Sequence, residues 1–315
     1  MFYSTILDNR MQYIKTTAVK LDRVQVLFPE YEIMGTIASG GMGTVYLAKH
    51  KYLKRETAIK VLNEDSAKDN RIVDSFLREA HSMCIVNHTN VVMIYDFGLR
   101  NGHYFITMEY INGKSLHYSA HNKSIDPEIS LNLVIGITRG IAYAHDNNIV
   151  HRDIKPSNIV LTHRKVPKIC DFGLAHHVDH VETKLYATKG YSAPETFVDA
   201  KKIGPHSDVY SIGVVFYELL MGYLPDLKNY TPPSKANHVN IKTDNIIARC
   251  LQADISSRYA DAGKLLADLL DLRYLGISQA NNTEKLKEII KYDNGISHKQ
   301  VFHTTQLTNK NKRKA

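Results

Sequence analysis

Short runs rich in β-branched and aromatic residues follow one another over the first third of the chain. Turn residues separate several of them: Ser39-Gly40-Gly41-Met42-Gly43 lies between the first two and Asn101-Gly102 between the last two. This pattern predicts a set of β-strands. The runs span residues 31–37, 44–48, 57–62, 91–98 and 104–110.

One amphipathic helix interrupts these strands. Ile72, Phe76, Glu79 and Met83 recur at spacings of four, three and four, so they share one helix face. Glu79 is a carboxylate on an otherwise apolar stripe, and a buried charge needs a partner. Alternatively, Glu79 lies at the edge of the stripe and points to water.

Helical patterns dominate after residue 110. Asp126 and the following Pro-Glu begin a helix that we expect to end near residue 147. Residues 209–221 are apolar nearly all round, as in a fully buried helix, and leucines at 265–270 indicate a late amphipathic helix. A short helix is expected over 283–292. Strands first and helices later predict an α+β protein in two lobes.

Charge changes this prediction little. The 315 residues carry 40 Lys and Arg against 32 Asp and Glu, a formal net charge of +8. Part of the excess lies near the end of the sequence, at Lys310, Lys312, Arg313 and Lys314. A terminal charge run is usually a solvated tail, and we expect no nucleic-acid partner.

The cysteines and apolar segments bear on the compartment. Cys84, Cys170 and Cys250 are widely spaced and form no CxxC pair, which favours a reducing compartment. No signal-peptide pattern opens the sequence. The longest apolar stretch, 212–224, contains Glu218 and is too short to span a bilayer. We therefore expect no transmembrane segment and a cytoplasmic location, with export from a bacterial cell left open.

Two segments suggest phosphate chemistry. Glycines at 40, 41 and 43 let main-chain N–H groups approach phosphates, although a plain hairpin would show the same pattern. Lys60 ends an apolar run nineteen positions before Glu79. A Lys60–Glu79 pair would satisfy both charges and aim the lysine at phosphate oxygens.

The segment His-Arg-Asp-Ile-Lys-Pro-Ser-Asn at 151–158 carries the strongest signal. It places two cations, a carboxylate and an amide between apolar flanks, where a polar surface loop is the alternative. Asp171-Phe172-Gly173 begins thirteen residues after Asn158. Side-chain oxygens of Asn158 and Asp171 together suit Mg²⁺.

These motifs together resemble those of the protein kinase family, and most closely the bacterial Hanks-type (eukaryotic-like) Ser/Thr kinases. The resemblance covers roughly residues 29–272. It implies a bilobal kinase domain, with an antiparallel sheet and one αC-type helix over 29–110 and a mainly helical lobe over 111–272. An N-terminal extension would occupy 1–28, and a short helix and basic tail 273–315.

The resemblance also implies the roles of individual residues. Asp153 accepts or orients the proton of the substrate hydroxyl, Lys155 steadies the transferring phosphate, and Lys60 pairs with Glu79. Mg²⁺, with Mn²⁺ as an alternative ion, is held by Asn158 and Asp171. The ATP site takes residues from the glycine loop, the adenine pocket, the gatekeeper and the hinge: Ile37, Gly40, Gly41, Gly43, Val45, Ala58, Lys60, Met108, Glu109 and Ile111.

Further implied positions lie in the helical lobe. Glu195 in Ala-Pro-Glu pairs with Arg258, and Asp208 holds the catalytic loop. Thr188 lies near the catalytic aspartate. Arg152 goes with control by phosphorylation, for which we expect Thr183 as the main site; alternatively, this loop is ordered without phosphate.

The function expected from the resemblance is transfer of phosphate from ATP to Ser and Thr hydroxyls of proteins, including its own activation loop, with a transient dimer left open. A pseudokinase scaffold and a small-molecule kinase are the alternatives. The retained metal and phosphate residues argue against the first, and Lys155, Glu195 and Arg258 argue against the second. A zinc site is disfavoured, because no tetrahedral set is evident among His176, His177, His180 and Cys170.

Overall fold

The computed structural model describes residues 23–172, 176–177, 187–237 and 239–279. The chain forms two compact units, residues 1–269 and 270–315. All described sheets belong to the first unit. The helix expected over 283–292 lies outside the described residues.

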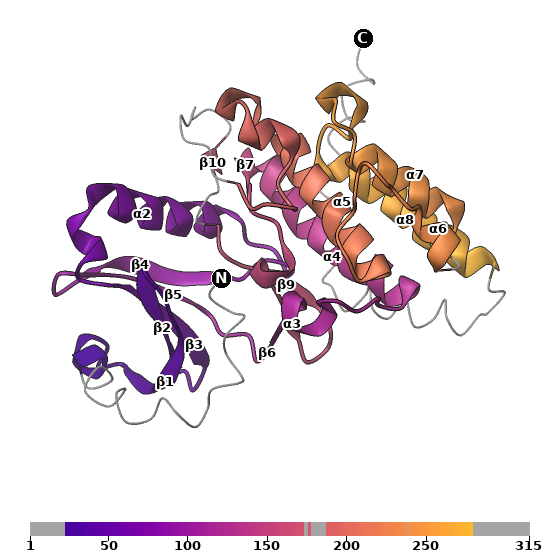
Figure 1. Ribbon diagram of the computed structural model, residues 1–315. Coiled ribbons are helices and arrows are strands. Elements are labelled where there is room, and N and C mark those ends of the chain that lie inside the picture. The colour runs from indigo at the N-terminus through magenta and orange to yellow at the C-terminus, as the bar shows by residue number, and fades with distance from the viewer. Residues whose placement is uncertain (1–22, 173–175, 178–186, 238, 280–315) are drawn as a thin grey trace, which may run out of the picture. The chain divides into compact units, whose positions relative to one another are not determined.

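A five-stranded antiparallel sheet forms the N-terminal lobe (Figure 1). Its spatial order is β1-β2-β3-β5-β4. This confirms the predicted set of strands. The strands are β1 (Tyr31–Ser39), β2 (Gly43–His50), β3 (Glu56–Leu62), β4 (Ile94–Arg100) and β5 (His103–Glu109).

The fourth strand differs from its prediction. The apolar run begins at residue 91, but β4 begins at Ile94. Val91 instead forms an isolated parallel bridge with Ile169, and it is fully buried. The start of the run therefore joins the sheet to the segment that precedes Asp171.

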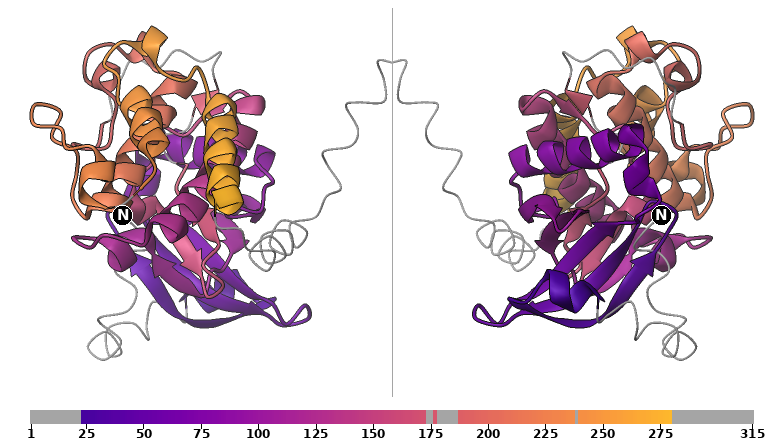
Figure 2. Two further views of the ribbon diagram at one scale, coloured as in Figure 1. Left: turned by 90° about the vertical axis from the view of Figure 1, so that its right-hand side faces the viewer. Right: turned by 90° about the vertical axis from the view of Figure 1, so that its left-hand side faces the viewer.

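The predicted amphipathic helix is α2 (Asn70–Ile85), which lies along the sheet (Figures 1 and 2). The Asp69 side chain caps it by accepting a hydrogen bond from the Arg71 main-chain N–H. Phe76, Glu79 and Met83 are buried, as their spacing predicts. The helix thus carries a carboxylate into the interior of the lobe.

Residues ahead of the sheet complete its core. Residues 23–27 are helical, and Val24, Leu27 and Phe28 belong to a buried apolar cluster with side chains of β1, β2, β3 and β5. The domain boundary expected between residues 28 and 29 stays a prediction, although these three side chains pack on its kinase-domain side.

Helices make up most of the second lobe (Figure 1). Asp126 caps α4 through hydrogen bonds from the main-chain N–H groups of Glu128 and Ile129. Every residue of α5 from Ser207 onward is buried, as predicted, and the helix ends at Gly222, whose φ of +79° favours glycine. The helices are α3 (Leu116–Ala120), α4 (Pro127–Asp146), α5 (Pro205–Met221), α6 (Pro233–Ala236), α7 (Ile241–Cys250) and α8 (Ala262–Gln279).

Small sheets and single turns connect these helices. A three-stranded sheet has the order β6-β8-β9, and β7 pairs with β10. The strands are β6 (Gly113–Ser115), β7 (Ile149–Val150), β8 (Ile159–Thr162), β9 (Pro167–Ile169) and β10 (His176–His177). The 3₁₀ turns are η1 (Ser66–Lys68), η2 (Pro156–Asn158), η3 (Pro194–Phe197), η4 (Ala200–Lys202) and η5 (Ile255–Ser257).

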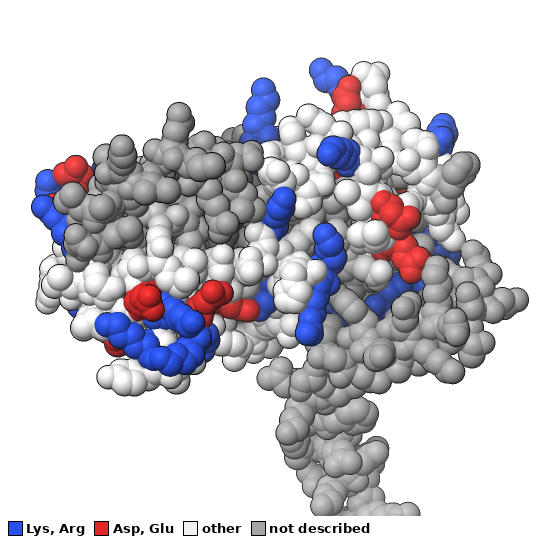
Figure 3. All heavy atoms as spheres, turned by 90° about the horizontal axis from the view of Figure 1, so that it is seen from below, with Lys and Arg blue, Asp and Glu red and all other residues white. Residues whose placement is uncertain are grey.

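Two further observations concern the helices and the charged surface. None of the described helices combines the length and apolar character that a bilayer-spanning segment needs. Seen from below, basic and acidic side chains lie next to one another on the described surface (Figure 3). In the sheet, for example, Lys49 on β2 lies in register with Glu32 on β1 and Glu56 on β3.

Candidate active site

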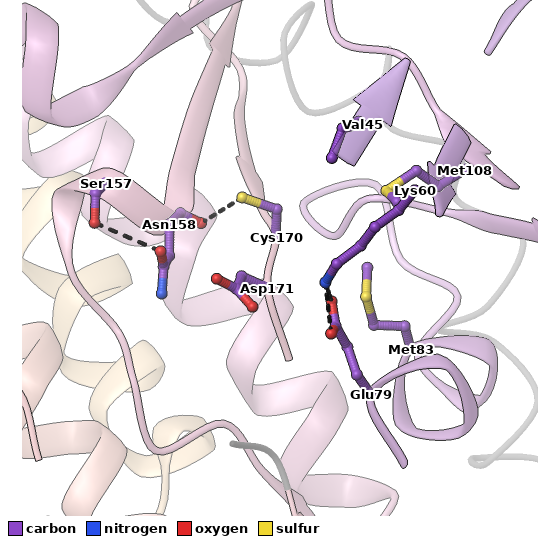
Figure 4. Close-up of a pocket in the computed structure, with 9 residues that line it drawn as sticks. All are labelled: Val45, Lys60, Glu79, Met83, Met108, Ser157, Asn158, Cys170 and Asp171. Atoms are coloured by element: carbon purple, nitrogen blue, oxygen red, sulfur yellow. Dashed lines mark hydrogen bonds and ion pairs between the residues drawn. The ribbon is translucent and has the colours of Figure 1, made fainter. Parts of the chain in front are cut away.

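A pocket brings together residues from both lobes of the first unit (Figure 4). They come from β2, β3, α2 and β5 on one side, and from η2 and the segment after β9 on the other. Its lining residues are Val45, Lys60, Glu79, Met83, Met108, Ser157, Asn158, Cys170 and Asp171.

The ion pair predicted from sequence spacing is present in this pocket. Lys60 Nζ lies 2.7 Å from each carboxylate oxygen of Glu79, and both residues are 7% exposed (Figure 4). Burial alone would lower the pKa of Lys60, but the carboxylates of Glu79 and Asp171 outweigh burial and raise it. The lysine is therefore a fixed cation beside the pocket, and the alternative in which Glu79 points to water is excluded.

The two predicted metal ligands, Asn158 and Asp171, face the same pocket. Asn158 Nδ2 donates to the main-chain oxygen and to Oδ2 of Asp153, both at 2.9 Å, which turns its Oδ1 to the other side. Burial alone would raise the pKa of Asp171, but the Lys60 cation leads the interactions that lower it. A charged carboxylate and an amide oxygen suit Mg²⁺, so these residues fit the ion; their role as ligands stays a prediction.

The Asp153 carboxylate lies in a compact polar cluster. Lys155 Nζ contacts its Oδ1 at 2.9 Å and Oδ2 at 2.6 Å. The Thr188 hydroxyl donates to Oδ1 at 2.7 Å and accepts from Lys155 Nζ at 3.1 Å. A hydroxyl group is thus held between a carboxylate and an ammonium group, which is the arrangement needed to position an alcohol for phosphoryl transfer.

Comparison with known families agrees with this geometry. Residues 31–275 match the family described as "Protein kinase domain". The chain belongs to the protein kinase family. The two-lobed arrangement of a sheet lobe and a helical lobe is accordingly the bilobal protein kinase fold.

Several curated bacterial kinases are similar in sequence. Serine/threonine-protein kinase PrkC of Bacillus subtilis is 34% identical over 317 residues, which cover 90% of this chain and 48% of PrkC. Serine/threonine-protein kinase PknB of Mycobacterium tuberculosis is 30% identical, over 78% of this chain and 43% of PknB. The kinase chain thus spans less than half the length of these two relatives.

Solved structures show the same fold. The kinase domain of Mycobacterium tuberculosis PknI superimposes with a TM-score of 0.61 at 22% identity, covering 77% of this chain and 96% of that one. A point mutant of that domain gives the same TM-score and identity. This likeness supports the arrangement of the lobes alone.

A buried carboxylate anchors the loop that carries Asp153. Asp208 accepts from the main-chain N–H groups of His151 and Arg152, both at 2.8 Å. His145 Nε2 lies 2.9 Å from Asp208 Oδ2, and its Nδ1 accepts from the Ala262 N–H, so Nε2 carries the proton that bonds to Asp208. Burial alone would raise the pKa of Asp208, but the hydrogen bond from His145 leads the interactions that lower it.

Two residues of the site have a strained backbone, and one of them, Arg152, is bonded to Asp208. Arg152 and Asp171 have φ angles of +69° and +65°, in the left-handed region that few non-glycine residues adopt. Such a conformation costs about 1–3 kcal/mol and persists only where surrounding contacts enforce it. His151 contributes packing, because its ring centroid lies 4.5 Å from that of Phe172.

The predicted Glu195–Arg258 pair is also formed. The guanidinium donates to both carboxylate oxygens, at 2.7 and 2.9 Å, and Ser207 Oγ donates to Glu195 at 2.8 Å. Burial alone would raise the pKa of Glu195, but the Arg258 hydrogen bond leads the interactions that lower it. The pair ties η3 to the residues that follow α7.

The pocket is lined by only some of the residues that were predicted to bind ATP. Val45, Lys60 and Met108 line it; the other predicted residues are Ile37, Gly40, Gly41, Gly43, Ala58, Glu109 and Ile111. Their roles stay predictions. Gly43 is required where it is, because a Cβ there would lie 2.6 Å from the Val61 carbonyl oxygen. Thr183 lies outside the described residues.

Sequence reasoning missed several residues around the site. Met83 and Cys170 line the pocket. The sequence pattern placed Met83 only in a helix stripe, and Cys170 was considered as a zinc ligand. Lys168 Nζ contacts Glu109 Oε2 at 2.7 Å and so fixes the predicted hinge to β9. His145 gave no signal, because its partner Asp208 lies 63 residues away. Among the described residues, no group of His, Cys, Asp and Glu could hold a metal ion through three or more side chains. Of the four residues considered for zinc, His180 and the side chains of His176 and His177 lie outside what the structure describes.

Proposed function

We propose that the chain is a Ser/Thr protein kinase that transfers the γ-phosphate of Mg-ATP to protein hydroxyls. The observation that carries this proposal is the Thr188 hydroxyl held between Asp153 and Lys155, at 2.7 and 3.1 Å. An incoming Ser or Thr hydroxyl at that position would meet the same two groups. The names of the relatives PrkC and PknB, both serine/threonine-protein kinases, support the substrate class.

Each residue then has a defined task. Asp153 orients the hydroxyl and takes its proton, and Lys155 neutralises charge on the transferring phosphate. Lys60, held by Glu79, contacts the α- and β-phosphates. Asn158 and Asp171 would hold Mg²⁺, which neutralises phosphate charge when bound. Val45 and Ala58 would pack on adenine, Met108 would be the gatekeeper, and the main chain of Glu109 to Ile111 would bind adenine.

A labelled-ATP assay tests this proposal. The whole chain is incubated with Mg-ATP and a generic basic protein, and Asp153→Ala serves as the control. A positioned base contributes about a hundred- to ten-thousand-fold, so the variant should lose that much activity. Equal labelling by both proteins would overturn the proposal. ATP binding without transfer would indicate a pseudokinase, and transfer to small molecules alone a small-molecule kinase.

Regulation through the activation loop is a second part of the proposal. The main-chain N–H of Arg152 is fixed by Asp208, so its side chain starts from an anchored position in the catalytic loop. A phosphate on Thr183 would form charge-assisted hydrogen bonds with Arg152 and order the loop. Mass mapping after incubation with Mg-ATP tests this. An active enzyme with unmodified Thr183 would contradict it.

Location and assembly complete the proposal. We propose that the protein acts in the cytoplasm on protein substrates, with Mn²⁺ able to replace Mg²⁺. Neither nucleic acid nor a membrane is a proposed partner, and a transient dimer would serve autophosphorylation in trans. Fractionation of cells followed by immunoblotting tests the location, and a concentration-dependent rate of autophosphorylation would show the dimer.

A further inference from the structure

The tip of the glycine loop is bonded to the segment that joins β3 to α2. Asn63 Nδ2 donates to the carbonyl oxygens of Gly40 at 3.1 Å and Gly41 at 3.2 Å, and Ser66 Oγ donates to the Gly41 oxygen at 3.1 Å. The Asn63 main-chain N–H donates to the Met42 oxygen at 3.0 Å. Three consecutive carbonyl groups of the loop are therefore held by one short segment.

These bonds determine the direction of the main-chain N–H groups. In a trans peptide the N–H points opposite to the carbonyl of the preceding residue, and the described bonds are all trans. With the carbonyls of residues 40–42 turned to Asn63 and Ser66, the N–H groups of residues 41–43 point away from that segment. On that side they can donate to phosphate oxygens, as consecutive main-chain N–H groups do in anion-binding loops.

We propose that Asn63 and Ser66, here called the loop clamp, are positioning residues that preorganise the glycine loop for the phosphates of ATP. This rests on the proposed function. A loop with three glycines has large conformational freedom, and ordering it on binding weakens affinity. The clamp orders the loop beforehand. Ser66 is only 6% exposed, so its hydroxyl has a fixed neighbour rather than water.

The clamp also links the loop to the Lys60–Glu79 pair. Asn63 follows Lys60 by three residues, and Ser66 begins η1, which leads through Asp69 into the helix that carries Glu79. A shift of α2 would therefore move the clamp together with Glu79. The phosphate donors and the phosphate lysine are in this way held by one continuous segment.

Measuring the binding of three ligands to the whole chain distinguishes a role in phosphate binding from a loss of affinity for every ligand. Calorimetry with Mg-ATP, Mg-ADP and adenosine is carried out on wild type, Asn63→Ala, Asn63→Asp and Ser66→Ala. Asn63→Ala removes two neutral hydrogen bonds, so the Kd for ATP and ADP should rise about five- to tenfold. Asn63→Asp should weaken both more, because its carboxylate faces two carbonyl oxygens. Ser66→Ala should weaken both about threefold, and adenosine binding should not change.

A matched control is Gln252→Ala. Its side-chain amide also donates to a main-chain oxygen, that of Ala248 at 3.1 Å, but in the helical lobe. This variant should bind all three ligands as wild type does. If Asn63→Ala does not fold, Ser66→Ala carries the test.

Two results would overturn the clamp while leaving the proposed function intact. One is ATP affinity within twofold of wild type in the Asn63 and Ser66 variants. The other is an equal loss of ATP and adenosine affinity, which would indicate a distorted adenine pocket. Wild type that binds no Mg-ATP would instead overturn the proposed function, and the clamp with it.

Discussion

Replacing Glu79 with Gln should destabilise the protein strongly, although the two side chains have nearly the same shape. Glu79 accepts two 2.7 Å contacts from Lys60, and both residues are 7% exposed. The neutral amide leaves the Lys60 cation buried without its bidentate partner. Lys60, the predicted phosphate lysine, would then lose the contact that orients it, so phosphoryl transfer should fall together with stability.

The magnitude follows from the burial of the pair. Breaking a buried ion pair by removing one partner costs about 3–5 kcal/mol. Asp171 also stabilises the Lys60 cation, so we expect the lower end, about 3 kcal/mol. Replacing both residues by apolar ones, as in Lys60→Met with Glu79→Leu, removes both charges of the pair and leaves only Asp171 without the Lys60 cation. The double variant should therefore lose less stability than the sum of the Lys60→Met and Glu79→Leu losses.

Urea unfolding followed by circular dichroism measures these differences. Tyrosine signals are less suitable, because 19 Tyr are distributed through the chain and there is no Trp. The reasoning would be refuted by a Glu79→Gln protein within about 0.5 kcal/mol of wild type, the range of ordinary surface substitutions. Losses in the double variant that equal the sum of the single losses would refute it as well.

Three further predictions follow from the other buried groups. Arg258→Met should cost about 3 kcal/mol at pH 7. In wild type the lowered Glu195 pKa stabilises the fold above about pH 4.5, and this stabilisation is lost as pH falls further. In the variant, Glu195 without its partner has a raised pKa and protonation relieves its buried charge, so the urea midpoints of the two proteins should converge toward pH 5. Midpoints that stay equally far apart would contradict this. Asp208→Asn should lower the transfer rate at least tenfold, because one of two loop N–H groups loses its acceptor; an unchanged rate in a kinase assay would argue against the anchor. Asn158→Ala should raise the Mg²⁺ concentration for half-maximal activity severalfold, and an unshifted Mg²⁺ titration would count against that ligand.

The sequence predicted the fold and the contacts of the site correctly where the informative residues lie within one helix or strand or at a fixed spacing. The stripe of Phe76, Glu79 and Met83 predicts both the helix and the buried face, and the unmatched carboxylate predicts the partner Lys60. Asp126 predicts the start of α4 for the same reason, because a cap acts on its own next three residues. These predictions rest on local geometry alone.

The contacts that sequence reasoning missed join residues distant along the chain. Lys168 lies 59 residues from Glu109, and His145 lies 63 residues from Asp208. Nothing in the pattern around a lysine or a histidine indicates which distant carboxylate it meets. Asn63 was missed for another reason: its partners are glycine carbonyl groups, which have no side-chain signature.

The start of β4 shows tertiary structure overriding a local pattern. The run from Val91 has the β-branched composition of a strand, yet Val91 pairs with Ile169 and not with β5. β-propensity indicates that a residue fits a half-buried pleated surface. Both the five-stranded sheet and the sheet that contains β9 have such a surface. The choice between them depends on a contact 78 residues away.

The most direct test of the central claim is the rate of phosphate transfer by Asp153→Asn. The amide can still contact Lys155 and Thr188, so ATP binding and folding should be retained while proton acceptance is lost. Single-turnover transfer from labelled Mg-ATP to a Ser/Thr peptide should fall by about two to four orders of magnitude, with the ATP Kd within twofold of wild type. Transfer at the wild-type rate with ATP bound would contradict the assignment of Asp153 as the catalytic carboxylate.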